Sequence, residues 1–189
     1  MLVEHVPEHD EALLRVLFLC TANIARSPYA ERRARQLVDG ASLAVASAGV
    51  PGVPGRGMDP EMAAQLRARG VEPDGHVSRR VTRELLVDAE LVLTFEFAQR
   101  VRLSEAWPDQ AIKVFGLRQF ADALDRVRSP GRGLELLDQV YAASRPDGLN
   151  ADLPDPYGRG TAAAREAAAE IDAVLTRIIP ALAGRGTSR

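Results

Sequence analysis

The chain has 189 residues, of which 46% are hydrophobic and 26% are charged. This composition is typical of a globular protein with one core that is large enough to be stable by itself. The net charge of −2 argues against a general nucleic-acid binder, and no stretch approaches the roughly 20 apolar residues that a membrane-spanning helix needs. The single cysteine excludes an intrachain disulfide.

The same features predict where the protein works. An unpaired cysteine fits a reducing compartment, and the acidic N-terminal stretch lacks the pattern of a signal peptide. We therefore expect a cytoplasmic protein that has no nucleic-acid or membrane partner.

A buried strand, a short loop and a helix follow one another near the start of the chain. Residues 16–20 are all apolar, which is typical of a strand covered on both faces of a parallel sheet. Residues 21–25 then form a short loop, and a helix is predicted with Ser27 near its N-cap and Pro28 at its first position. The loop therefore lies between a strand end and a helix N-terminus.

This arrangement suits a phosphate site with a nucleophile beneath it. Backbone N–H groups at a helix N-terminus can converge on an anion, and the guanidinium of Arg26 can bind two phosphate oxygens. The same positive field favours the thiolate form of Cys20 over the thiol. A thiolate beneath a phosphate cradle indicates a phosphatase, whereas the alternative is that Cys20 is an ordinary buried core thiol.

The other elements, taken in chain order, predict alternating strands and helices. Further strands are expected at residues 43–48, 91–94 and 112–115. Helices are expected from 27 to about 39 and at 60–69, 81–89, 97–106 and 161–182. The segment 126–150 also has helical spacing; it is either an added helix near the pocket mouth or a surface insertion, and we favour the latter. Four strands that alternate with helices imply right-handed crossovers, a parallel sheet and a site at the carboxyl ends of its strands.

The stretch from Val16 to Pro28 resembles the signature of the low-molecular-weight protein tyrosine phosphatases, Cys-x-Gly-Asn-x-x-Arg-Ser-Pro. Further resemblances follow in the family's order at Ser47-Ala48-Gly49, Asp59-Pro60, His76 with Arg79, Leu91 to Thr94, and Pro154-Asp155-Pro156-Tyr157. The resemblance implies one domain over residues 15–182, with an N-terminal extension at 1–14 and a C-terminal tail at 183–189. It implies a Rossmann-like, three-layer α/β fold of the phosphotyrosine phosphatase I type, in which helices flank a four-stranded parallel sheet.

The resemblance also implies the roles of individual residues. Cys20 is the nucleophile, Arg26 binds the phosphate, and Asp155 is the general acid on a loop whose Tyr157 lines the pocket entrance. The residues implied to surround the bound phosphate are Thr21, Ala22, Asn23, Ile24, Ala25 and Ser27.

Other residues are implied to support the loop or to wall the pocket. Ser47 and His76 are implied to brace the loop through Asn23 and Ser27. Ala22 departs from the family, which often has glycine there, and alanine carries a penalty if the position needs a positive φ. The family's pocket wall often carries a large aromatic residue, but here residues 49–57 offer mainly valine, proline and glycine.

The implied reaction is hydrolysis of phosphotyrosine through a phosphocysteine, with no metal or other cofactor. The substrate is expected to be a phosphotyrosine-containing protein or a small aryl phosphate. Protein-arginine phosphatases are one alternative, but they resemble Asn-Thr where this chain has Asn23-Ile24, and an apolar Ile24 favours an aryl ester. Arsenate reductases have Gln in place of Pro28, and the kind with an internal disulfide relay needs more cysteines, so this activity would require an external thiol. A non-catalytic phosphotyrosine-binding module would lack the nucleophile or the acid, and both are present.

Overall fold

The computed structural model describes residues 14–38, 43–145 and 152–184. Nearly all of the predicted N-terminal extension, residues 1–13, lies outside the described residues. The same is true of residues 185–189 in the predicted tail and of residues 146–150 in the predicted insertion. Within the described ranges, no helix combines the length and the apolar composition that crossing a bilayer requires.

Four parallel strands of the described chain form one sheet in the order β2-β1-β3-β4. Their bounds are Leu14–Cys20 for β1, Leu43–Gly49 for β2, Leu91–Thr94 for β3 and Val114–Gly116 for β4. Cys20 lies opposite Gly49, and Leu19 lies opposite Thr94. The strands β1, β2 and β3 therefore end together, so the loops that follow them meet at one edge of the sheet.

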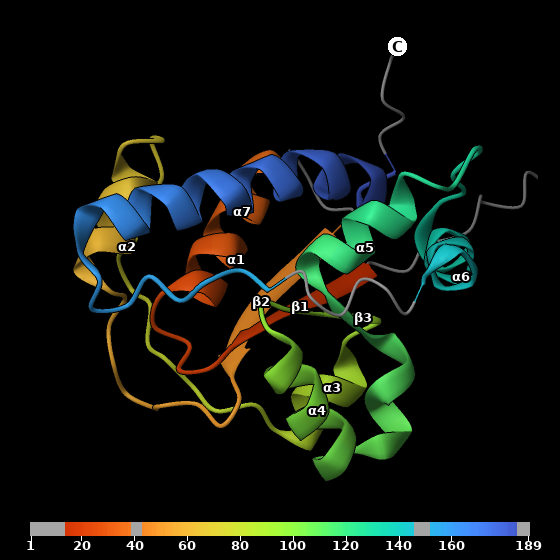
Figure 1. Ribbon diagram of the computed structural model, residues 1–189, viewed down its shortest axis with the longest axis horizontal. Coiled ribbons are helices and arrows are strands. Elements are labelled where there is room, and N and C mark those ends of the chain that lie inside the picture. The colour runs from red at the N-terminus through yellow and green to blue at the C-terminus, as the bar shows by residue number, and fades with distance from the viewer. Residues whose placement is uncertain (1–13, 39–42, 146–151, 185–189) are drawn as a thin grey trace, which may run out of the picture.

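Helices cover both faces of this sheet (Figure 1). One face carries α1 (Arg26–Leu37), α2 (Pro60–Arg67), α5 (Leu117–Leu124) and the long α7 (Gly160–Leu182). The other face carries α3 (Arg83–Asp88) and α4 (Phe97–Ala106). A 3-10 helix, η1 (Pro108–Lys113), leads into β4, and α6 (Gly133–Ala143) packs beside α5. The predicted fold class, a four-stranded parallel sheet flanked by helices, is confirmed.

The two layers explain the unbroken apolar run of the first strand. Val16 and Phe18 join the core formed with α1, α5 and α7, whereas Leu17 and Leu19 join a second core that includes Leu86 of α3. Side chains alternate between the faces of a strand, so a strand covered on both faces is apolar at every position. The hydrophobic effect of both layers thus holds the strand that ends at Cys20.

Two sequence expectations need correction near β4. The strand predicted at 112–115 begins only at Val114. Residues 108–113 form a 3-10 helix that begins at Pro108, and Ile112 within it is 66% exposed. The helix α5 was not predicted, although Leu117, Phe120 and Leu124 are buried at helical spacing. Its eight residues are too few for a clear periodic signal between two short elements.

The helix α6 lies within the segment that we interpreted as a surface insertion. Its Leu136 and Val140 are fully buried and belong to the main core. Tyr141 packs edge-to-face on Phe115 of β4, with 6.5 Å between the ring centroids. The helix therefore extends the hydrophobic core beyond the last strand.

A half-buried cluster of charges ties α1 to α7 and to the end of α2. Asp172 of α7 accepts hydrogen bonds from the Tyr29 hydroxyl at 3.0 Å and from Arg33 Nε at 2.8 Å, and it pairs with Arg69. The pKa of Tyr29 is raised above its usual value, mainly because the side chain is buried and secondly because of the negative charge of Asp172. The hydroxyl therefore keeps the proton that it donates. The first turn of α1, which begins at Arg26, is thereby held against α7.

Candidate active site

The loop after β1, residues 21–25, packs against the loop that begins at Val50 after β2. Val50 N–H donates to the carbonyl of Cys20 at 2.9 Å, and Gly52 N–H donates to the carbonyl of Thr21 at 2.9 Å. A Cβ atom on Gly49 would lie 2.7 Å from Gly52 Cα and 2.8 Å from the carbonyl carbon of Ala22. A glycine at position 49 is therefore required for this close approach of two backbones.

Cys20 lies at the base of the loop and is only 2% exposed. Its Sγ lies 3.0 Å from Ser27 Oγ, and Asn23 N–H donates to the sulfur at 3.3 Å. Pro28 was predicted at the first helical position, but α1 begins at Arg26, so Pro28 is its third residue. Ser27 lies two residues after the N-cap, Ala25, and makes no capping bond. The Ser27 hydroxyl points at the sulfur instead, and two donors are thus available to a thiolate.

Asn23 holds the loop in shape. Its φ of 61° makes it the one non-glycine residue with a positive φ in the described ranges. Its Nδ2 donates to Ser27 Oγ at 3.0 Å and to Ser47 Oγ at 2.9 Å, while its Oδ1 accepts from Arg79 N–H at 2.9 Å. Asparagine tolerates this conformation better than most residues because its side chain can bond locally. The residue that needs a positive φ is Asn23, so Ala22 carries no such penalty.

The two residues implied to brace the loop do contact it. His76 Nε2 lies 2.8 Å from the carbonyl oxygen of Asn23, which can only accept, so this nitrogen carries the proton. Ser47 Oγ accepts from Asn23 and donates to Glu31 Oε2 at 2.5 Å, and Glu31 pairs with Arg35 one turn further along α1. The hydrogen-bond network therefore runs from the sulfur to the protein surface.

Arg26 is 1% exposed, yet its guanidinium is surrounded by oxygens. Nη1 donates to the Leu153 carbonyl at 2.7 Å and pairs with Glu96, and Nη2 lies 2.9 Å from Asp155 Oδ2. Despite that short distance, Nη2 makes no aligned hydrogen bond to any described residue, and neither does Nε. Two buried donors of one guanidinium are thus left for another acceptor.

Asp155 reaches Arg26 from a loop that is anchored to the carboxyl end of β3. Leu153 N–H donates to the Phe95 carbonyl at 2.8 Å, and Asp152 Oδ1 accepts from Phe97 N–H at 2.7 Å. The Asp155 side chain itself is 44% exposed, so it has room to turn.

The other residues predicted to belong to the site differ in their burial and in their contacts. Ile24 and Ala25 are buried, with Ile24 only 6% exposed, so they offer a substrate mainly their backbone N–H groups. Thr21 Oγ1 accepts from Gln99 Nε2 of α4 at 3.2 Å. Tyr157 is exposed beside Asp155, and its backbone N–H donates to the Asp155 carboxylate at 3.2 Å.

Glu96 and Gln99 contact the site but were not identified from the sequence. The available signal was their position, because Glu96 follows the end of β3 after Phe95, and ligands of parallel sheets bind at that edge. No group of three or more His, Cys, Asp or Glu side chains suited to a metal ion occurs in the part of the chain that the structure describes.

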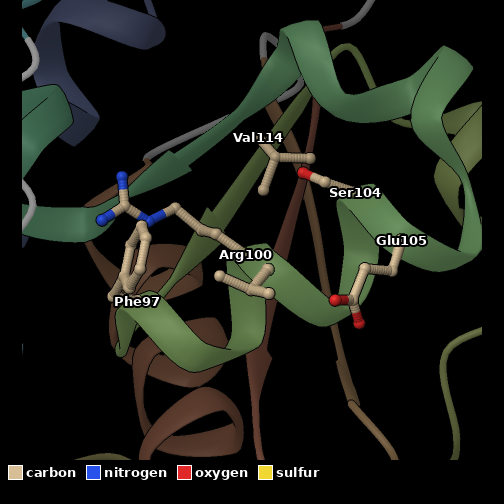
Figure 2. Close-up of a pocket in the computed structure, with 6 residues that line it drawn as sticks. Phe97, Arg100, Ser104, Glu105 and Val114 are labelled. Carbon is tan, nitrogen blue, oxygen red and sulfur yellow. The ribbon is translucent and has the colours of Figure 1, made fainter.

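A separate hollow of about 440 Å³ lies along α4 and contains none of these residues (Figure 2). The guanidinium of Arg100 lies over the Phe97 ring at one end, while Ser104 and Glu105 lie at the other. Burial lowers the pKa of Arg100, and the Asp152 charge opposes this shift. The hollow shares no lining residue with the cluster around Cys20 and Arg26.

Comparison with known proteins identifies the class to which this chain belongs. A family model for the low molecular weight phosphotyrosine protein phosphatases matches residues 15–142. The low molecular weight protein-tyrosine-phosphatase Wzb of Salmonella typhi is 30% identical over 148 residues, which cover 75% of this chain and 98% of that protein. The chain therefore belongs to the low molecular weight phosphotyrosine protein phosphatase family, and it is a phosphatase by class.

Two solved structures are similar over most of their length. The low molecular weight protein tyrosine phosphatase of T. tengcongensis matches with a TM-score of 0.70 and 27% identity, covering 89% of this chain and 99% of that one. The YwlE arginine phosphatase of Geobacillus stearothermophilus matches with a TM-score of 0.69 and 26% identity, covering 88% and 90%. The two relatives are named for different phosphorylated residues, so the fold alone does not select the substrate.

The conformation of Asn23 can be tested through stability. Asn23→Gly and Asn23→Ala both lose the three side-chain hydrogen bonds to Ser27, Ser47 and Arg79, but only glycine tolerates the positive φ without strain. We expect Asn23→Ala to have a free energy of unfolding about 1 kcal/mol lower than that of Asn23→Gly. Urea denaturation measures the difference. Ala22→Gly is the matched control and should not gain stability; an alanine variant at 23 that is as stable as the glycine variant would contradict the assigned backbone.

Proposed function

We propose that this chain hydrolyses phosphotyrosine through a phosphocysteine on Cys20. The observation that supports this most directly is the state of Arg26, which is buried and keeps two nitrogens without an aligned acceptor among the described residues. Leaving buried donors unpaired is costly, and a phosphate group offers several oxygens to a planar guanidinium. Membership of a phosphatase family agrees with this assignment.

In the first step the Cys20 thiolate attacks phosphorus in line with the leaving oxygen. The S–P bond forms, the bond from phosphorus to the aryl oxygen breaks, and Asp155 gives its proton to that oxygen. Ser27 Oγ and Asn23 N–H, at 3.0 and 3.3 Å from the sulfur, stabilise its negative charge before attack. Arg26 and the remaining backbone N–H groups of the loop, those of Thr21, Ala22, Ile24 and Ala25, stabilise the charge on the other phosphate oxygens.

In the second step a water molecule attacks the phosphorus of the phosphocysteine. The S–P bond breaks, inorganic phosphate leaves, and the Cys20 thiolate is regenerated. The Asp155 carboxylate takes a proton from the attacking water, so the acid of the first step is restored and the cycle balances.

The contacts of Arg26 suggest how substrate engages the site. Glu96 and the Leu153 carbonyl hold one side of the guanidinium, while Asp155 lies 2.9 Å from Nη2 on the other. An incoming phosphate competes with Asp155 for this nitrogen. Displacement of the carboxylate then frees Asp155 to approach the leaving oxygen.

The proposed substrate is a phosphotyrosine-containing protein or a small aryl phosphate. Tyr157 and Val53 are exposed, one beside the proposed acid and the other in the wall of residues 49–57. The proposal places the protein in the cytoplasm and treats residues 15–182 as its catalytic domain.

The phosphate contact can be tested by replacing Arg26. Arg26→Lys keeps the charge but loses the planar fork, so we expect kcat/KM for an aryl phosphate to fall by at least about 10². Cys20→Ser is the companion variant: it should have no turnover yet still bind phosphate or vanadate in a titration. Turnover that survives in Cys20→Ser would rule out the covalent intermediate.

The acid can be tested through the leaving group. Asp155→Asn should slow phosphotyrosine hydrolysis by roughly 10² to 10⁴, because a basic phenolate leaves poorly without a proton. An aryl phosphate with a strongly acidic phenol should be affected far less. Steady-state kinetics on both substrates gives the two ratios, and equal losses would reassign Asp155 to a structural role.

A protein-arginine phosphatase is the second candidate function. It is favoured by the similarity to a solved arginine phosphatase, whereas the apolar Ile24 in the phosphate loop favours an aryl ester. Ile24 is buried, so any influence of its side chain on a substrate acts through the shape of the loop of residues 21–25.

The position 24 side chain separates these two functions. Ile24→Thr introduces a hydroxyl, and we expect the ratio of phosphoarginine to phosphotyrosine hydrolysis to rise by about tenfold, the scale of single-group pocket changes. Parallel assays of wild type and variant on both substrates measure this ratio. An unchanged ratio would show that Ile24 does not set specificity and would shift that role to residues 49–57.

A further inference from the structure

We propose that a second cavity, beside the loop of residues 21–25 (the phosphate loop), binds an acidic side chain of a phosphotyrosine-containing substrate. The cavity has a volume of about 250 Å³ and lies between the loop after β2 and helix α4. It is lined by Val50, Pro51, Arg80, Val81, Arg102, Ala106 and Trp107. The inference rests on the proposed function, since it adds a contact for residues that flank the phosphorylated one.

One wall of this cavity is fixed to the strand end that carries Cys20. Val50 N–H donates to the Cys20 carbonyl at 2.9 Å, and Val81 N–H donates to the Gly49 carbonyl at 2.8 Å. Arg80 thereby forms a parallel bridge with Gly49. A Cβ atom on Gly52 would lie 2.7 Å from Arg80 Cα, so the backbone at Arg80 is closely packed and well defined.

The opposite wall of the cavity belongs to α4, and this helix is bonded to Thr21, the residue after Cys20. Gln99 Nε2 of α4 donates to Thr21 Oγ1 at 3.2 Å. Arg102 and Ala106 follow Gln99 by three and seven residues, so they lie on the same face of the helix. This face extends about 10 Å from Gln99 to Ala106, a distance that roughly three residues of extended peptide can span.

The charge of the cavity selects its occupant. Arg80 and Arg102 are both exposed, and neither makes an ion pair with any acidic residue in the described ranges. Asp109 lies two residues after Trp107 but is already held by both terminal nitrogens of Arg83, at 3.1 and 2.6 Å. A carboxylate is the natural partner of two guanidinium groups, and its aliphatic stem can pack on Trp107 and Pro51.

The larger hollow in Figure 2 offers no comparable selection. It lies on another face of α4, carries one positive and one negative side chain, and its Arg100 is bound to Gln119 at 2.5 Å. The cavity of Arg80 and Arg102 has charge of one sign only. Val50 of one wall bonds Cys20, and Gln99, on the helix that forms the other wall, bonds Thr21.

The test compares pairs of phosphotyrosine peptides that differ by Glu or Gln at successive positions within four residues of the phosphotyrosine. We expect wild type to favour the Glu peptide in kcat/KM by about fivefold at one or more positions, with less preference at high ionic strength. The double variant Arg80→Gln, Arg102→Gln should lose this preference, while its hydrolysis of a small aryl phosphate changes less than about twofold. Arg128→Gln, in the segment between α5 and α6 and outside the lining of the cavity, is the control and should keep the preference.

Two outcomes separate this inference from the proposed function. If wild type hydrolyses the small aryl phosphate but shows no preference, or if the double variant keeps it, the acidic subsite is wrong and the phosphatase assignment stands. If wild type hydrolyses no aryl phosphate, calorimetric titration of the Cys20→Ser chain with the same peptides decides the subsite. Equal affinity for the Glu and Gln peptides would then overturn it.

Discussion

The left-handed backbone of Asn23 is the constraint on which the active site depends. That conformation turns the Asn23 N–H toward the sulfur of Cys20 and leaves its carbonyl for His76. The side chain at the same time bonds the hydroxyls of Ser27 and Ser47. A single residue thus sets the curvature of the loop and orients the groups around the Cys20 sulfur. Because each of these partners comes from a different element, the loop is shaped by the whole sheet edge.

The buried charge of Arg26 is the second constraint on the site, because it must be compensated. Several loops together supply the oxygens that do so. Taking a guanidinium out of water costs several kcal/mol unless oxygens replace the lost hydration. Here they come from Glu96 after β3 and from Leu153 and Asp155 in a loop far along the chain. The cation is therefore held in place while keeping donors that a phosphate can use.

The parts of the fold that the sequence predicts are those with strong local patterns. Five of the seven residues of β1 were recognised from one apolar run, because a strand covered on both faces must be apolar throughout. The strand near Ile112 was misplaced because its apolar residues fit a 3-10 turn equally well, and only pairing with β3 distinguishes the two. Ser27 was predicted near the helix N-cap from its residue type, but Ala25 is the cap and the Ser27 hydroxyl contacts Cys20 and Asn23.

The sequence by itself determined the strand, loop and helix around Cys20 and Arg26, because these residues are neighbours along the chain and local pattern and turn chemistry suffice. The resemblance implied a place for Asp155 in the site, but only the tertiary structure decided that Asp155 and Glu96 both contact Arg26. It alone also decided that Arg80 and Arg102 line one cavity. Those meetings depend on strands that are distant in sequence ending at one edge of the sheet. The local sequence around a residue far along the chain does not indicate which loop it will meet. The strand order β2-β1-β3-β4 decides this, because it determines which loops lie side by side.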